Sequence, residues 1–142
     1  MFLVKMILDA SVIFKWYVKK DEADMVQADL ILEKFVAGTE NIKVPDLLIY
    51  EISNALFFCK QLSLQDKQLA IAKFFDLGIE IVPINKNNII ESITIDEKQN
   101  ITIYDAIYLA LAKNFNEPLI TANPKHQKLS KNYKVIQLKD YS

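Results

Sequence analysis

The chain has 142 residues, of which 51% are hydrophobic and 25% charged, the composition of one ordinary soluble domain rather than a disordered segment. Two glycines, four prolines and one cysteine exclude a collagen-like chain, a disulfide-stapled scaffold and a cysteine-based zinc cluster. The formal net charge is −1, so the whole molecule gives no electrostatic reason to expect a polyanionic partner. An intracellular, cytoplasmic protein is the expectation.

The basic residues are unevenly distributed. Residues 113–142 contain six lysines and two acids, a local charge of +4, so the first 112 residues sum to −5. This lysine-rich end is either a solvated face or a patch that contacts phosphates. All 17 basic residues are lysine, and without arginine any contact with nucleic acid should be mostly non-specific.

The first predicted element is a strand at residues 3–8, which is followed directly by Asp9. Its apolar run is too short for a signal peptide or a membrane span. Ser11 is expected to cap a short helix, and Asp21 a longer helix that stops before Gly38.

The middle of the chain continues the alternation of strands and helices. Residues 42–44 form the second expected strand, and Pro45 with Asp46 opens a strongly apolar helix that reaches about residue 60. Ser63 with Asp66 resembles a capping box and predicts a further helix.

The last part of the chain is predicted to add strands at 79–82, 119–121 and 135–138 and helices at 85–97 and 102–113. The alternation predicts an α/β fold, a three-layer α/β/α sandwich with a mainly parallel central sheet, as one domain over residues 1–142. In such sheets the functional crevice lies at the carboxyl ends of the strands.

Three acidic residues stand where they could share that crevice. Asp9 ends the first strand, although a lone aspartate there could simply cap the next helix. Asp105 lies in the first turn of a helix, where it could also complete a capping box with Thr102. Glu51 lies in a helix that is apolar on most sides, so we expect this helix to be buried on most sides. Asn54 is on the same face as Glu51, and a buried glutamate is expected to have a partner.

Carboxylates brought together at one edge repel each other unless a cation neutralises them. Oxygen ligands without a histidine suit Mg²⁺ or Mn²⁺ rather than zinc. The one histidine, His126, is expected to be a surface residue in a lysine-rich turn, and Cys59 a small buried hydrophobe. There is no nucleophilic triad and no glycine-rich phosphate loop in this pattern.

The sequence resembles the PIN-domain family, and specifically the small VapC-type toxin ribonucleases, over nearly its whole length. Three segments carry the resemblance: Ile7-Leu8-Asp9-Ala10-Ser11 with the residues to Trp16, Val44-Pro45-Asp46 with the residues to Leu56, and Thr102-Ile103-Tyr104-Asp105 with the residues to Ala112. The resemblance implies that Asp9, Glu51 and Asp105 are catalytic, metal-binding acids, supported by Ser11 and Asn54.

The chain departs from the family pattern at Asn123, where the family usually has a fourth aspartate. An asparagine can still offer a carbonyl oxygen to a hard cation, but it removes one negative charge and makes a second metal position doubtful. Asn123 could equally be ordinary turn chemistry before Pro124.

The resemblance implies metal-assisted hydrolysis of RNA, giving 5′-phosphate and 3′-hydroxyl ends. It also implies a homodimer and a cognate VapB-type antitoxin. Four lysines that follow strand ends are candidates for binding RNA: Lys15, Lys19, Lys125 and Lys128.

Two other functional classes stay open. A catalytically impaired PIN-like module that binds RNA or protein without cutting is suggested by Asn123. A phospho-acceptor receiver domain also gathers acids at strand ends, but Leu8-Asp9-Ala10 lacks the paired acid that it needs.

Overall fold

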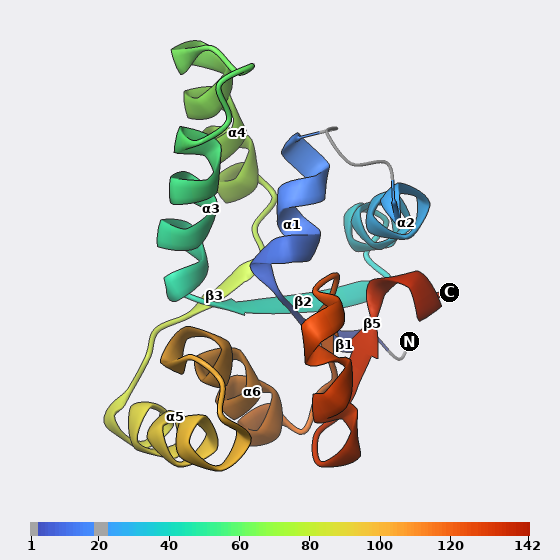
Figure 1. Ribbon diagram of the computed structural model, residues 1–142. Coiled ribbons are helices and arrows are strands. Elements are labelled where there is room, and N and C mark those ends of the chain that lie inside the picture. The colour runs from blue at the N-terminus through green and yellow to red at the C-terminus, as the bar shows by residue number, and fades with distance from the viewer. Residues whose placement is uncertain (1–2, 19–22) are drawn as a thin grey trace.

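A single parallel sheet forms the centre of the computed structural model, which describes residues 3–18 and 23–142 (Figure 1). Its strands lie in the order β3-β2-β1-β4-β5, and each neighbouring pair is parallel. The strands are β1 (Val4–Leu8), β2 (Glu40–Pro45), β3 (Glu80–Val82), β4 (Leu119–Thr121) and β5 (Val135–Gln137).

Helices cover both faces of this sheet. On one face lie α1 (Ala10–Tyr17), α2 (Met25–Val36), α3 (Leu47–Phe57) and α4 (Leu64–Asp76), and on the other α5 (Lys86–Gln99) and α6 (Ile103–Phe115) (Figure 1). Two short 3₁₀ helices, η1 (Pro124–Lys131) and η2 (Leu138–Asp140), flank β5. Separate apolar clusters fill the two faces, so the predicted three-layer α/β/α sandwich is confirmed.

Local capping explains where several helices begin and end. Ser63 and Asp66 form the predicted reciprocal capping box at the start of α4. Thr102 accepts a hydrogen bond from the backbone N–H of Asp105 over 3.2 Å and so starts α6. Gly78 adopts a φ of +76° just after α4, which a residue with a side chain rarely does.

Some predicted boundaries are wrong. Ser11 does not cap α1, because Asp9 occupies the N-cap position and the Ser11 hydroxyl is used elsewhere. Asp24 holds the N-cap position of α2, which begins at Met25; the predicted cap, Asp21, lies outside the described residues. The helix expected to reach about residue 60 ends at Phe57.

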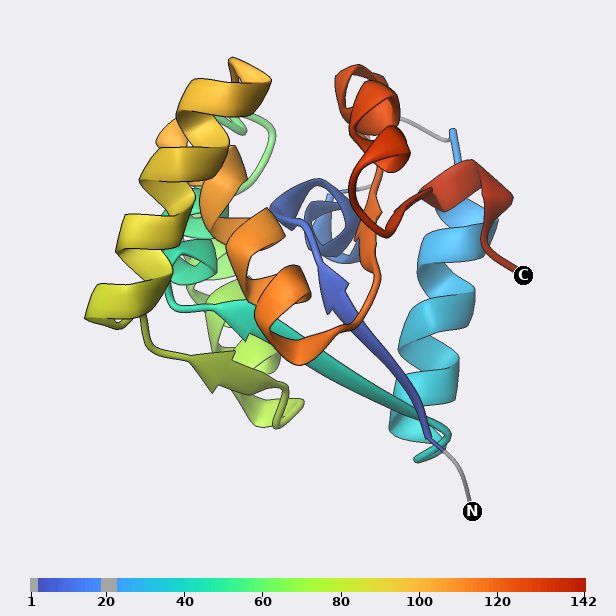
Figure 2. The same ribbon diagram turned by 90° about the horizontal axis from the view of Figure 1, so that it is seen from below.

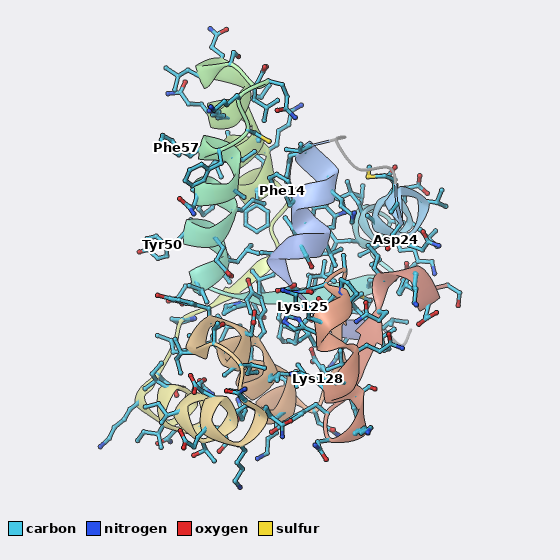
Figure 3. The ribbon with its side chains drawn as sticks, viewed as in Figure 1. Phe14, Asp24, Tyr50, Phe57, Lys125 and Lys128 are labelled. Atoms are coloured by element: carbon cyan, nitrogen blue, oxygen red, sulfur yellow. The ribbon has the colours of Figure 1, made fainter. Side chains whose placement is uncertain are left out.

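Helix α3 is buried on one face only, which corrects the prediction that most of its sides are buried. Leu48 and Ile52 pack into the core, but Tyr50 is 74% exposed and Phe57 68% exposed. Both rings project away from the sheet and from α1, whereas Phe14 points between α1 and α3 (Figure 3). The reason is that α3 extends beyond the sheet, so only the side facing α1 and α4 is covered (Figure 1).

None of the helices in residues 3–18 and 23–142 is long and apolar enough to cross a membrane.

Candidate active site

The candidate site lies where β1 and β4 end, with α6 on one side and η1 on the other (Figure 2). Chain direction determines this placement: all strands are parallel, so the residues that follow them meet at one edge of the sheet. Asp9 follows β1, Asp105 lies in the first turn of α6, and Glu51 projects from α3.

Asp9 is held by hydroxyl groups rather than by the start of a helix. It is buried, and its Oδ2 accepts hydrogen bonds from Ser11 Oγ at 2.6 Å and from Thr121 Oγ1 at 3.0 Å. No side-chain capping bond forms at the N-cap of α1, so the alternative that Asp9 acts as a helix cap is not what the structure shows. Both bonds fall on Oδ2, which leaves Oδ1 for another partner.

Glu51 is partly buried and is bound by a tyrosine. The Tyr108 hydroxyl donates to Glu51 Oε1 over 2.7 Å. Burial raises the pKa of the Glu51 carboxyl to about 7, the Tyr108 hydrogen bond opposes this, and the charges of Asp9 and Asp105 add to it. The charges of Asp9 and Asp105 therefore act on the Glu51 carboxyl.

Asp105 is paired with the one histidine of the chain. His126 Nε2 lies 3.2 Å from Asp105 Oδ2. This hydrogen bond lowers the pKa of the Asp105 carboxyl and raises the pKa of the His126 imidazole, although burial opposes both shifts. Asp105 is consequently ionised near neutral pH.

The prediction that His126 is a surface residue is wrong. The side chain is buried, and its Nδ1 lies 3.4 Å from Thr121 Oγ1. Because the single Thr121 hydroxyl proton is donated to Asp9, Nδ1 makes a hydrogen bond only by donating, just as Nε2 must donate to the Asp105 carboxylate. The hydrogen bond to Asp105 favours the protonated form of the ring, which is the direction in which the pKa of His126 moves.

The local sequence indicates that a helix begins near His126 but not that this residue is buried. Asn123 caps η1 and Pro124 occupies its first turn. These signals do not determine which face of η1 packs against the sheet.

The three polar residues predicted to support the acids, Ser11, Asn54 and Asn123, lie in different environments. Ser11 Oγ donates to Asp9 and accepts from the backbone N–H of Ala122 over 3.0 Å, so it ties β4 to the site. Asn54 is exposed on α3. Asn123 Oδ1 accepts from the backbone N–H of Lys125 over 3.0 Å, which is the turn role that the sequence left open.

Two of the candidate RNA-binding lysines lie beside Asp105. Lys125 and Lys128 are exposed on η1 (Figure 3). Together with Asn123 and His126 they line a surface depression that includes Asp105. Lys15 instead donates to the backbone carbonyl of Ala23 over 3.0 Å. Lys19 lies outside the described residues.

The model of the PIN domain matches residues 6–132 of this chain. The chain belongs to the PIN-domain family. This match spans every element that carries the candidate site, from β1 to η1, and it agrees with the parallel sheet and its two helical layers.

Solved structures share this PIN fold at low sequence identity. PAE2754 from Pyrobaculum aerophilum is 21% identical, covers 96% of this chain and 90% of its own, and gives a TM-score of 0.70. VapBC2 from Rickettsia felis, bound to a DNA fragment from its promoter, is 17% identical with a TM-score of 0.69, covering 94% and 98%. VapC20 from Mycobacterium tuberculosis, a toxin that cleaves the sarcin-ricin loop, is 9% identical with a TM-score of 0.66, covering 90% and 95%. The comparison with curated proteins gave no match.

The donor atoms of this PIN domain suit a hard divalent cation. In the part of the chain that the structure describes, no three His, Cys, Asp or Glu side chains are placed closely enough to enclose a metal. Mg²⁺, however, usually keeps several waters and binds through only one or two carboxylates. Asp9 and Asp105 offer such oxygens, and the mutual repulsion felt by Glu51 is what a cation would relieve.

Proposed function

We propose that this PIN domain is a metal-dependent endoribonuclease and the toxin of a VapBC-type toxin–antitoxin pair. The observation that carries the proposal is that the carboxylates of Asp9 and Asp105 are held at the carboxyl edge of the sheet by hydrogen bonds from Ser11, Thr121 and His126. Glu51 lies in their electrostatic field, and its pKa is raised by burial and, to a smaller extent, by these two acids. Family membership and the fold shared with VapC20 and VapBC2 support the same activity.

The chemistry follows from the roles available to the three acids. A Mg²⁺ or Mn²⁺ ion held by Asp9 and Asp105 would polarise the scissile phosphate and lower the pKa of an attacking water. Ser11 and Thr121 fix Asp9 before any ligand arrives, which lowers the cost of organising the site. Glu51, with a pKa of about 7, is suited to orient that water or accept its proton near neutral pH.

Lys125 and Lys128 provide positive charge for the RNA backbone beside Asp105. Lysine attracts phosphate as a point charge, without the forked geometry of arginine, so these residues are suited to hold RNA rather than to read its bases. Their contribution should weaken as the salt concentration rises.

The proposed partners are a VapB-type antitoxin and a second copy of the chain, both in the cytoplasm. Exposed aromatic side chains on α3 and at its C-cap, namely Tyr50, Phe57 and Phe58, give this end of the molecule an apolar outer face. A face of this kind favours association with another protein surface, and we assign it to the homodimer.

A non-cutting PIN-like binding module is the second candidate. The observation that favours it is Asn123, whose carbonyl oxygen is already used by the backbone of Lys125. Such a module would fold and bind RNA or protein without needing a metal.

Cleavage of an RNA pool separates the two candidates. The purified protein is incubated with Mg²⁺, with Mn²⁺ and with EDTA, beside Asp9→Asn and an exposed control, Glu33→Gln. A nuclease requires metal, loses activity in Asp9→Asn and keeps it in Glu33→Gln. RNA binding without cleavage in every sample would instead support the binding module.

A further inference from the structure

We propose that His126 is a positioning residue that holds the Asp105 carboxylate in a fixed relation to Asp9. The inference rests on the proposed function, because it concerns the same metal-binding carboxylates. It gives a role to a buried side chain that the three acids alone leave unexplained.

A continuous chain of contacts joins the two acids through His126. Thr121 Oγ1 donates to Asp9 Oδ2 over 3.0 Å and lies 3.4 Å from His126 Nδ1. At the other end of the ring, Nε2 lies 3.2 Å from Asp105 Oδ2. Thus β1 is linked at one edge of the sheet to α6, β4 and η1, which lie far from it in sequence.

The ring is held rigidly enough to impose a position. His126 is 5% exposed and Thr121 is fully buried. The backbone N–H of His126 donates to the Asn123 carbonyl over 3.1 Å, and Gln137 Nε2 donates to the same carbonyl over 3.1 Å. A side chain locked in this way fixes its partner with little further loss of conformational freedom.

Asp105 is the acid that needs such support. Its side chain is 32% exposed, whereas Asp9 is buried and held by two hydroxyl groups. Donation from His126 Nε2 to Oδ2 restrains the rotation of the Asp105 carboxylate. Partners of this kind, which orient a metal ligand without touching the metal, typically change metal affinity or activity by about 10–100-fold.

Two substitutions of His126 distinguish a role in positioning Asp105 from a role in merely filling space in the core. The amide nitrogen of glutamine can reach the place of Nε2, whereas that of asparagine reaches only the place of Nδ1. We expect His126→Gln to bind Mn²⁺ within about threefold of the parent. His126→Asn should bind Mn²⁺ at least about tenfold more weakly and cleave RNA with a lower kcat but a similar KM.

The affinity for Mn²⁺ is measured by calorimetry on the RNA-free protein, so this result does not depend on finding the right RNA. Equal affinities in the parent and His126→Asn would overturn the proposal. Tighter binding in His126→Asn would also overturn it, because the ring would then be a competitor of the cation rather than a support for its ligand.

If His126→Asn does not fold, the proposal can still be tested by nuclear magnetic resonance of the parent protein. The chain has one histidine, so its imidazole signals are unambiguous. During a titration with Mg²⁺, these signals should shift and saturate together with metal binding, and an unchanged spectrum at saturating Mg²⁺ would contradict the proposal. A parent that binds Mn²⁺ but cuts no RNA would refute the nuclease function alone, whereas a parent that binds no metal would refute both.

Discussion

The Tyr108 hydroxyl donates a hydrogen bond to Glu51 Oε1 over 2.7 Å and so joins α6 to α3 beside the acidic edge. Tyr108 is buried and Glu51 only partly so. The tyrosine stabilises the ionised form of a carboxyl group that burial and two neighbouring acids would otherwise keep protonated. This bond therefore lowers the pH at which the Glu51 carboxyl becomes ionised.

Metal affinity should rise with pH through neutrality. Burial and the neighbouring acids raise the pKa of Glu51 to about 7, so below that pH a cation must displace a proton from this group. Calorimetric affinity for Mn²⁺ should increase between pH 6 and pH 8 and then level off. Glu51→Gln should bind more weakly and lose most of this dependence, and a parent affinity that stays constant over this range would count against the assignment of Glu51.

Tyr108→Phe should move this dependence to higher pH. The substitution removes a hydrogen bond that lowers the pKa of Glu51, and it leaves the carboxylate with one donor fewer. We expect a loss of about 1–2 kcal/mol in the free energy of unfolding at pH 8, measured with urea. The matched control is Tyr104→Phe on the same helix, where the ring is 56% exposed and little change is expected. Identical pH midpoints in the parent and Tyr108→Phe would rule out this role.

Glu40→Gln should stabilise the protein above neutral pH. Glu40 is buried, and neither of its carboxylate oxygens has a hydrogen-bond partner in the described structure. Burial raises the pKa of Glu40 to about 7, although the charge of Lys34 opposes the shift. A raised pKa in the folded state means that stability falls as the pH rises from about 4.5 to 7 and stays low above it.

The gain from Glu40→Gln should be on the order of 1 kcal/mol at pH 8 and smaller at pH 5. Urea unfolding of the parent, Glu40→Gln and the exposed control Glu33→Gln at both pH values measures it. A loss of stability at pH 8 would show that the buried carboxylate makes a favourable contact in solution.

A charge placed on the outer face of α3 should disrupt the proposed homodimer. Phe57→Lys puts an ammonium group where a ring is 68% exposed, and Val26→Lys on α2 is the control at a site that is 78% exposed. Sedimentation at micromolar concentration should give a dimer for the parent and Val26→Lys and a monomer for Phe57→Lys. If Phe57→Lys were still a dimer, the dimer interface would have to lie on another surface.

Much of the fold could be predicted because strong local signals agree with the tertiary structure. The capping box at Ser63, the cap at Thr102 and the short apolar runs of the strands specify their elements without help from distant residues. Asp9 and Asp105 were placed at the strand ends by chain direction alone, since parallel strands end at a common edge.

The errors came from tertiary contacts that the local sequence pattern does not show. His126 has polar neighbours along the chain, and only the packing of η1 against β4 and α6 explains why it is buried. The exposed face of α3 was missed because composition shows how apolar a helix is but not how far it extends past the sheet. The buried ion pair of Lys43 and Glu117, with Nζ 2.8 Å from Oε1, joins positions whose sequence gives no sign of each other.

The chemistry of the RNA ends tests the central claim most directly. RNA cut by the parent in Mn²⁺ is analysed for its termini beside Asp9→Asn and an EDTA control. Hydrolysis by a water activated at the acidic edge should leave 5′-phosphate and 3′-hydroxyl ends, and both controls should leave the RNA intact. Cyclic 2′,3′-phosphate ends, or cleavage that persists in EDTA and in Asp9→Asn, would contradict the account.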